Sequence, residues 1–186
     1  LWSTSDSTNS ISGLSPATYN VIASDSSGCI DTTSFTISSP PAIVLTSSGS
    51  DASCNGLNDG SAQVSATGGT GNTTYLWSSG DTTATASNLL GGTYTVVATD
   101  SNGCTSTDSV TISQPAPIVT NASISGNISC NGLSDGSATV LASGGVGSTT
   151  FLWSTSDATA SISSLGAGTY SVVATDSNGC TGTDTV

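Results

Sequence analysis

The sequence predicts an all-β fold: a tandem array of β-sandwich units with a period of about 76 residues. First, the motif Cys54-Asn55-Gly56-Leu57 returns as Cys130-Asn131-Gly132-Leu133, one period later. Second, short runs of alternating apolar and polar residues are separated by Gly, Asn and Asp turns, and nothing has helical periodicity. A fixed internal period with closely spaced short strands is typical of small β-sandwich modules.

A second motif, Asp100-Ser101-Asn102-Gly103-Cys104, repeats with the same period. It recurs as residues 176–180, and residues 25–29 are an earlier, imperfect copy. The same step separates the large aromatic residues Trp2, Trp77 and Trp153, and Tyr19, Tyr94 and Tyr170. Proline stops strands, and Pro40-Pro41 and Pro115-Ala116-Pro117 lie one period apart. We therefore divide the chain into the C-terminal part of one repeat (1–40), a complete repeat (41–116) and a repeat lacking its last few residues (117–186).

The expected strands of the complete repeat follow from alternation and turn signals. They cover residues 61–66, 74–77, 85–89, 93–99 and 104–112, and a long strand at 118–129 leads into the next repeat. The segment 100–103 predicts a tight hairpin turn in which Gly103 supplies a positive φ. The partial first repeat holds only the later strands, including one at Ile11–Leu14, and should expose apolar faces of Trp2 and Tyr19 unless other polypeptide covers them.

Composition excludes several classes of function. The net charge is −12 and there is no Lys, Arg or His, so binding to nucleic acid or to an anionic membrane surface has no electrostatic basis. No apolar run approaches the ~18 residues of a membrane span. The absence of His, Lys and Glu leaves no ordinary general base, so we expect no enzyme activity and no cofactor.

The cysteines predict disulfides, because units of this size have small cores. Cys54 and Cys104 have the same spacing as Cys130 and Cys180, which favours pairing within each repeat and leaves Cys29 to a partner upstream of residue 1. The alternative is Cys29–Cys54 with Cys104–Cys130, but about 25 extended residues would separate those sulfurs by roughly 80 Å. Zinc binding is disfavoured, since there is no CxxC motif and no His.

These motifs, taken in order, resemble the SprB repeat. The resemblance rests on Cys-Asn-Gly-Leu-x-Asp-Gly-Ser, a Tyr/Phe-Leu-Trp-Ser strand, Leu-x-x-Gly-Thr-Tyr-x-Val-Val-Ala-Thr-Asp-Ser-Asn-Gly-Cys and Val-Thr-Ile-Ser-Gln-Pro. The family occurs in giant surface adhesins and gliding-motility proteins of Bacteroidetes bacteria. It implies an Ig-like β-sandwich repeat, exported to the cell surface by type IX secretion, with no catalytic residues to carry over.

Two kinds of Asp motif give further candidate sites. Isolated Asp residues in turns, Asp59, Asp100, Asp135 and Asp176, are weak calcium candidates, but a structural turn role is favoured because calcium wants several converging oxygens. The resemblance also implies the O-glycosylation rule of that lineage, Asp followed by Ser or Thr and then a small or β-branched residue. The hydroxyls that match are Ser7, Thr32, Thr82, Ser109 and Thr185. By strand alternation, Thr32 and Ser109 should point outward.

Together these observations predict a structural and adhesive protein: a disulfide-stapled, O-glycosylated stalk or extracellular fibre on a bacterial surface. Its partners would be neighbouring repeats of one long chain, or identical subunits in a filament that exchange strands. The alternative is an array that binds polysaccharide or a surface through exposed tryptophans, although a single large aromatic in a small unit is more often a core residue.

Overall fold

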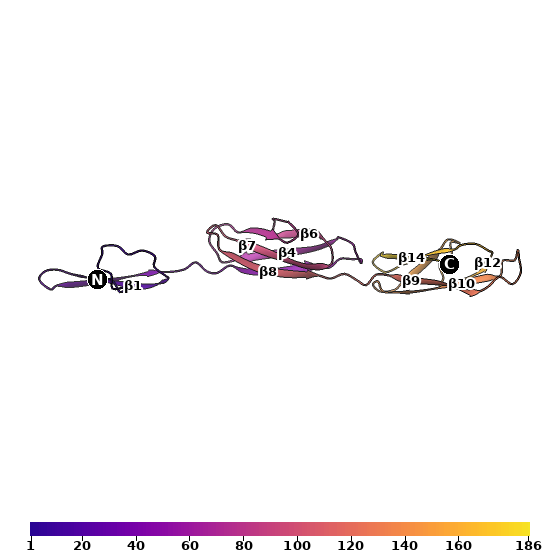
Figure 1. Ribbon diagram of the computed structural model, residues 1–186, viewed down its shortest axis with the longest axis horizontal. Coiled ribbons are helices and arrows are strands. Elements are labelled where there is room, and N and C mark those ends of the chain that lie inside the picture. The colour runs from indigo at the N-terminus through magenta and orange to yellow at the C-terminus, as the bar shows by residue number, and fades with distance from the viewer.

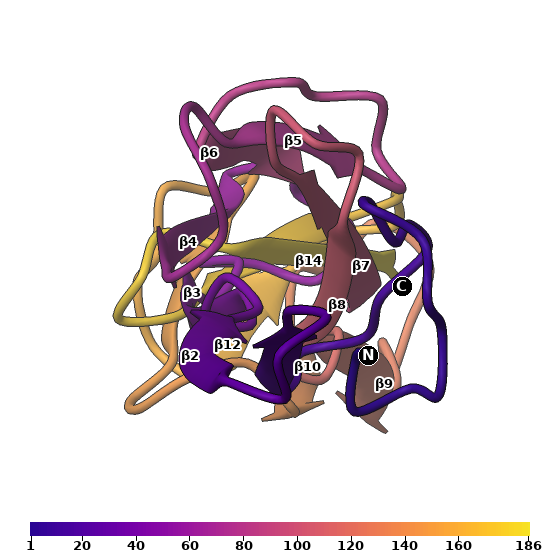
Figure 2. The ribbon, with the colours of Figure 1, turned by 90° about the vertical axis from the view of Figure 1, so that its left-hand side faces the viewer.

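The computed structural model describes residues 1–186 and is elongated, with three groups of strands in line (Figure 1). We call residues 1–40 unit 1, 41–116 unit 2 and 117–186 unit 3. Seen along the long axis, the units project onto one another (Figure 2), so the array is narrow. All 14 regular elements are strands, which confirms the all-β prediction. No helix is long and apolar enough to cross a membrane.

Units 2 and 3 are β-sandwiches of two three-stranded antiparallel sheets. In unit 2 the sheet orders are β3-β4-β6 and β5-β7-β8, and unit 3 repeats them as β9-β10-β12 and β11-β13-β14. The strands of unit 2 are β3 (Val44–Ser50), β4 (Gly60–Thr67), β5 (Thr74–Trp77), β6 (Thr85–Leu89), β7 (Gly92–Thr99) and β8 (Thr105–Ile112). Those of unit 3 are β9 (Val119–Gly126), β10 (Gly136–Ser143), β11 (Thr150–Trp153), β12 (Ser161–Leu165), β13 (Ser171–Thr175) and β14 (Thr181–Thr185). The predicted tandem β-sandwich is therefore confirmed.

The core of each sandwich forms where alternating residues of the two sheets face each other. In unit 2, Trp77 is 2% exposed and Val96 is fully buried, and both pack against Val64 of the opposite sheet. The Trp77 indole N–H donates to the Thr83 carbonyl at 3.0 Å, so its polar edge stays satisfied inside the core. Fully burying side chains of this size stabilises a fold by roughly 1.5–3 kcal/mol each. Trp153 repeats the arrangement in unit 3.

Unit 1 holds one antiparallel pair, β1 (Ala17–Ser24) and β2 (Ile30–Ile37). Trp2 joins it through an isolated bridge to Val21 and packs edge-on against Phe35, with ring centroids 5.7 Å apart. The strand predicted at 11–14 does not form. Its counterpart β6 pairs only with β4, and unit 1 has no strand equivalent to β4.

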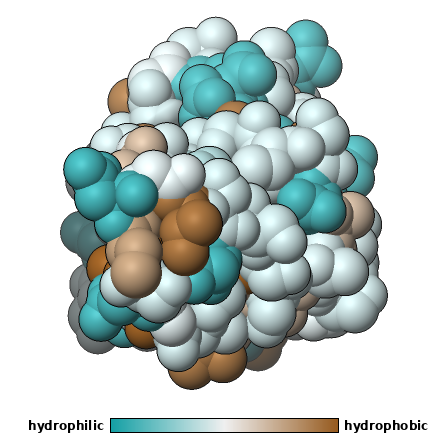
Figure 3. Space-filling model, turned by 90° about the vertical axis from the view of Figure 1, so that its right-hand side faces the viewer, coloured by the Kyte–Doolittle hydropathy of each residue, from teal (hydrophilic) through white to brown (hydrophobic).

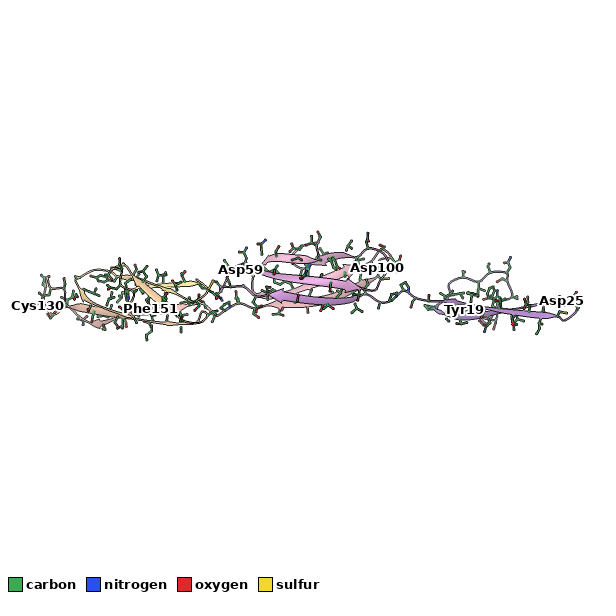
Figure 4. The ribbon with its side chains drawn as sticks, turned by 180° about the vertical axis from the view of Figure 1, so that it is seen from behind. Tyr19, Asp25, Asp59, Asp100, Cys130 and Phe151 are labelled. Carbon is green, nitrogen blue, oxygen red and sulfur yellow. A yellow bond between two sulfur atoms is a disulfide. The ribbon has the colours of Figure 1, made fainter.

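Each sandwich is longer along its strands than across them, so its turns and loops gather at two opposite ends. We call the end facing the preceding unit the N-terminal pole and the end facing the following unit the C-terminal pole. Figure 4 shows Asp100 at the N-terminal pole of unit 2 and Asp59 at the C-terminal pole. The β7–β8 turn therefore lies at one end of unit 2 and the β3–β4 loop at the other.

Candidate functional site: the joint between units

The chemically distinctive site of the molecule is the joint between units 2 and 3. A disulfide bond joins Cys54 to Cys180, whose Cα atoms are 5.6 Å apart and whose sequence positions differ by 126. Cys54 belongs to the β3–β4 loop at the C-terminal pole of unit 2. Cys180 belongs to the β13–β14 turn at the N-terminal pole of unit 3. The bond therefore crosses the joint.

This pairing corrects the predicted one. The expected bonds Cys54–Cys104 and Cys130–Cys180 are not formed, and Cys29, Cys104 and Cys130 are unpaired. Cys54 and Cys104 lie at opposite poles of unit 2, separated by the length of β8. Eight residues at strand rise span about 26 Å, far beyond the ~7 Å that a disulfide allows. The same geometry separates Cys130 from Cys180 in unit 3.

Backbone hydrogen bonds to a buried carboxylate fix the Cys180 half of the joint. Asp176 Oδ1 accepts the N–H groups of Asn178 and Cys180, each at 2.9 Å. Its Oδ2 accepts the N–H of Val146 at 2.7 Å. Burial opposes ionisation of Asp176, but these donors together hold its pKa below the ordinary value. The charged carboxylate thus organises the turn that presents Cys180.

The Cys54 half is fixed by a loop that folds on Asp59. The Asp59 carboxylate accepts the Ser53 hydroxyl and, at 3.0 Å, the Ser53 N–H, and these bonds lower its pKa. The Leu57 N–H donates to the Cys54 carbonyl, closing the turn on the other side of the cysteine. Cys54 is held beside the end of β8, because the Ala52 N–H donates to the Ser113 carbonyl at 3.0 Å.

The linker at 113–118 accepts hydrogen bonds from both units. From unit 2, the Asn55 side-chain amide donates to the Pro115 carbonyl at 3.1 Å. From unit 3, the Gly145 N–H donates to the Ala116 carbonyl at 3.0 Å. The Asn178 amide also donates across the joint, to the Ser53 carbonyl at 3.1 Å. A Cβ on Gly144 would lie 2.0 Å from the Pro117 oxygen, so the contact of unit 3 with the linker requires glycine there.

The four calcium candidates lie singly in these turns and do not converge. No group of three or more metal-binding side chains is present. Asp100 and Asp176 are buried with both carboxylate oxygens accepting backbone N–H groups. Asp59 and Asp135 are exposed and bind Ser53 and Ser129. The structure therefore displays the turn-forming role for all four.

A further Asp position, missed from the sequence, connects the two sheets of each sandwich. In unit 2 the Asp108 carboxylate on β8 accepts the Ser47 hydroxyl of β3, which lowers the Asp108 pKa. In unit 3 the Asp184 carboxylate on β14 accepts the Ala122 N–H of β9 at 2.7 Å, with the same effect on its pKa. Recurrence of Asp one period apart on an otherwise apolar-facing strand was the available signal.

The five predicted glycosylation hydroxyls, Ser7, Thr32, Thr82, Ser109 and Thr185, are all exposed, as the outward orientation requires. At three of the sites the preceding Asp carboxylate accepts the backbone N–H of the hydroxyl residue, at 2.8–2.9 Å. These three are Thr32, Ser109 and Thr185. Most Ser and Thr residues of the chain are also exposed, so exposure permits attachment at these sites without selecting them.

A hollow of about 330 Å³ lies in unit 3. Ile128, Leu165, Tyr170 and Val186 are among its lining residues. Unit 2 fills the same space with Ile112, whose methyl groups lie 2.6–2.8 Å from where a Cβ would stand on Gly49 or Gly60. Figure 3, which looks onto this end of the molecule, shows mostly neutral hydropathy with scattered apolar side chains.

Comparisons with known proteins agree with the repeat architecture. Residues 44–82 and 122–158 match the family model of the SprB repeat. A search of curated proteins finds no match to this chain.

Structural neighbours include three proteins with immunoglobulin or extracellular domains, at low similarity. Dpr2 Ig1-Ig2 in complex with DIP-Theta Ig1-Ig3 is 11% identical with a TM-score of 0.34, covering 92% of this chain and 72% of that one. Sidekick-1 immunoglobulin domains 1-5 are 13% identical with a TM-score of 0.38, covering 92% and 46%. Drosophila OTK extracellular domains 3-5 are 14% identical with a TM-score of 0.32, covering 92% and 69%.

At these scores the neighbours add nothing to the fold assignment, which rests on the paired sheets of units 2 and 3. The two family matches begin at or near the first strand of each sandwich and include its Cys-Asn-Gly-Leu loop. One match in each complete sandwich confirms the resemblance to the SprB repeat that the sequence motifs indicated.

Proposed function

We propose that this chain is part of an extracellular stalk, a structural array of β-sandwich repeats that holds an adhesive or motile surface protein away from the cell. The observation that carries the proposal is the joint. Cys54–Cys180 and the hydrogen-bonded linker fix one sandwich end-on to the next, with the units in line (Figure 1). A flexible tether would not need such a joint, whereas a spacer that must stay extended does.

The SprB match supports placement at the cell surface, and a disulfide supports an oxidising compartment. Export by type IX secretion is part of the same proposal. So is the partner: other repeats of one long chain, in preference to identical subunits that exchange strands. The half-covered sheet of unit 1 supports a covering segment, because Phe35 is 38% exposed where its counterpart Val110 is 8% exposed.

The rival function, sugar binding through tryptophans, has less support. Trp77 and Trp153 are each 2% exposed, so neither presents a ring face for stacking. Trp2 is half-buried and already packs on Phe35. The proposed role is accordingly mechanical, with no catalytic residue and no cofactor.

Location is tested on the organism that makes the protein. An antibody against residues 41–186 should label intact, unpermeabilised cells, and brief treatment with a broad-specificity protease should remove the label. Trypsin is the matched control, because these residues contain no Lys or Arg for it to cleave. Labelling only after permeabilisation would overturn the proposed location.

The mechanical role is tested by pulling the 186-residue chain by its ends. The bond between Cys54 and Cys180 shields 126 residues from extension. At about 3.3–3.6 Å per residue, reduction should lengthen the fully stretched chain by about 430 Å. The Cys54→Ser variant should show the longer length with or without reductant. Equal lengths for the oxidised and reduced parent chain would contradict a load-bearing joint.

The surface coat is the last part of the proposal. We propose O-linked sugars on Ser7, Thr32, Thr82, Ser109 and Thr185, whose exposed hydroxyls follow an Asp. Native material should exceed the 18.0 kDa polypeptide mass, and peptide mapping should place the added mass on these hydroxyls. Asp108→Asn should abolish modification of Ser109 and leave Thr82 modified. A bare polypeptide mass would rule out the coat.

A further inference from the structure

The cysteines of this chain fall into two kinds, and each kind occupies its own pole. Cys54 and Cys130 stand in Cys-Asn-Gly-Leu loops at C-terminal poles, which Figure 4 shows for Cys130 at the far end of unit 3. Cys29, Cys104 and Cys180 follow Asp-Ser-Asn/Ser-Gly turns, and those of Cys104 and Cys180 lie at N-terminal poles. The one disulfide present joins one cysteine of each kind across a joint.

Cys104 is unpaired, but its setting is that of the bonded Cys180. Asp100 Oδ1 accepts the N–H groups of Asn102 and Cys104, each at 2.9 Å, and its Oδ2 accepts the Thr70 N–H at 2.8 Å. These match the three bonds that Asp176 accepts around Cys180. The preceding linker accepts an equivalent hydrogen bond: the Gly69 N–H donates to the Pro41 carbonyl at 2.9 Å, as the Gly145 N–H does to the Ala116 carbonyl.

Cys130 likewise has the setting of the bonded Cys54. The Asp135 carboxylate accepts the Ser129 hydroxyl and N–H, as Asp59 does with Ser53. The Leu133 N–H donates to the Cys130 carbonyl at 3.1 Å, as the Leu57 N–H does to Cys54. Both unpaired cysteines are exposed, whereas the two bonded ones are half-buried.

We infer that Cys104 and Cys130 are each one half of a further inter-repeat disulfide clasp, identical in geometry to Cys54–Cys180. The partner of Cys104 is the Cys-Asn-Gly-Leu cysteine of the preceding repeat, a segment that unit 1 lacks. The partner of Cys130 is the cysteine after the Asp-Ser-Asn-Gly turn of the following repeat. Every joint of such an array carries one clasp, and no repeat carries a disulfide within itself.

Each clasp forms by oxidation of two thiols. Two S–H bonds break, one S–S bond forms, and two protons and two electrons pass to a disulfide oxidant. In the cell the oxidant is a thiol–disulfide oxidoreductase, and in the test tube it is oxidised glutathione, which leaves as two molecules of glutathione. The two cysteines of one repeat lie at opposite poles, a strand length apart. They therefore cannot form a disulfide with each other.

This pairing deepens the proposed stalk function, because it decides which residues carry tension. The shortest covalent route from the clasp before unit 2 to the clasp after unit 3 is the segment between Cys104 and Cys130, which are 26 positions apart. That segment contains β8 and β9, which are already extended and have 8 residues each. The rest of each sandwich lies inside a closed disulfide loop. An array clasped at every joint has little slack to release under load.

The test adds one repeat to the 186-residue chain. Val186 is equivalent to Val110, so a copy of residues 111–186 placed after Val186 continues the array in register. The copy's own Cys130 is changed to Ser, so that every alkylated Cys130 peptide comes from the original position. After refolding with oxidised glutathione, free thiols are alkylated and pepsin fragments are mapped at acid pH without reduction. We expect Cys54–Cys180 as before, and a new bond between Cys130 and the appended copy of Cys180. The Cys130 thiol should lose at least 90% of its alkylation.

Two controls make the outcome decisive. Changing the appended copy of Cys180 to Ser should return Cys130 to full alkylation with Cys54–Cys180 intact. In the unextended chain, Cys54→Ser should leave Cys180 a thiol, because Cys130 is at the opposite pole of its own unit. A Cys130–Cys180 bond in that variant would overturn the proposal. So would persistent alkylation of Cys130 in the extended chain, or its pairing with a second chain. These outcomes do not depend on where the protein is located, so they are separable from failure of the stalk function.

Discussion

Unit 1 and unit 2 share the Trp, Tyr and Asp-Ser-x-Gly-Cys motifs at equivalent positions but differ in how far those motifs are buried. Trp2 and Trp77 are equivalent, and the indole N–H of each donates to a carbonyl six residues later, at 2.8 and 3.0 Å. Yet Trp77 is 2% exposed and Trp2 is only half-buried. Local bonding is thus specified within the motif, whereas burial depends on strands elsewhere in the chain.

The missing element is the hairpin equivalent to β3 and β4. In unit 2, β4 contributes Ala62 and Val64 to the core, and β3 lies beside β8 at the sandwich edge. Unit 1 has no such hairpin, so the face formed by Val21 and Phe35 remains partly open. The comparison indicates that β3 and β4 convert a two-stranded ribbon into a closed sandwich.

Tryptophan truncation should give the largest contrast between these units. Trp77→Ala removes a fully buried side chain and should destabilise unit 2 by about 3–5 kcal/mol. Trp2→Ala should cost about 1 kcal/mol or less, because its site is already half open. Hydrogen exchange measured on peptides from each unit resolves the two effects. Trp153→Ala is the matched control and should reproduce the Trp77 result in unit 3; equal losses for Trp2 and Trp77 would refute the contrast.

Completing unit 1 should remove the contrast. A copy of residues 41–76, with its Cys54 changed to Ser, replaces Leu1 directly before Trp2. Its hairpin should cover the open face, and each side chain that becomes buried should stabilise unit 1 by about 1.5–3 kcal/mol. Hydroxyl-radical footprinting should then show oxidation of Trp2 falling to the level of Trp77. Scrambling the added sequence is the control, and unchanged oxidation of Trp2 beside the native copy would contradict the hairpin's role.

Two glycine substitutions should distinguish the cost of a clash with the linker from the cost of backbone strain alone. Gly144→Ala places a Cβ 2.0 Å from the Pro117 oxygen at a φ of +81°, and should destabilise unit 3 by about 2–3 kcal/mol. Gly132→Ala has a similar φ of +86° with nothing within 4 Å, and should cost about 1 kcal/mol. Thermal unfolding of the two variants measures the difference. Indistinguishable melting temperatures would show that the linker contact adds nothing to backbone strain.

Acid should produce the smallest effect, and it should arise in units 2 and 3. Hydrogen bonds hold the pKa values of Asp108 and Asp184 below the ordinary 3.8, so their contribution is present above pH ~4 and is lost as the pH falls through the lowered values. The melting temperature should therefore fall by a few degrees below pH 4. Measurement in 1 M salt screens the repulsion among the twelve Asp charges, which acid would otherwise relieve.

Replacing the carboxylate isolates this contribution. Asp108→Asn removes the titrating group that binds Ser47, so the melting of unit 2 should depend less steeply on pH than in the parent chain. Unit 3, which retains Asp184, serves as the internal control. An unchanged pH dependence in unit 2 would mean that the Ser47–Asp108 contact does not couple to folding.

Much of the fold was predictable from the sequence because its signals are local. The strands around Trp77 and Tyr94, the hairpin turn at 100–103 and the outward hydroxyl of Ser109 all follow from alternation and turn chemistry. The strand expected at 11–14 was wrong, since a five-residue edge strand such as β6 needs a neighbour to pair with.

The disulfide shows where the sequence alone could not decide. Equal spacing of Cys54–Cys104 and Cys130–Cys180 favoured bonds within each repeat, but spacing along the chain carries no information about which pole a turn occupies. Counting strand reversals would have helped: one strand separates the linker from Cys54, which places that cysteine at the far pole. Recognising that the opposing turn belongs to the next unit also required the end-on arrangement of Figure 1.

The amino-acid sequence by itself determined the period, the strands, the turns and the two kinds of cysteine, because each depends on residues close together in the chain. The tertiary structure decided which tryptophans are buried and which sulfurs meet. Burial of Trp77 requires β4 from an earlier part of the repeat, and the Cys54–Cys180 bond requires two sandwiches stacked pole to pole. Both are long-range contacts, fixed by how sheets and units pack against one another.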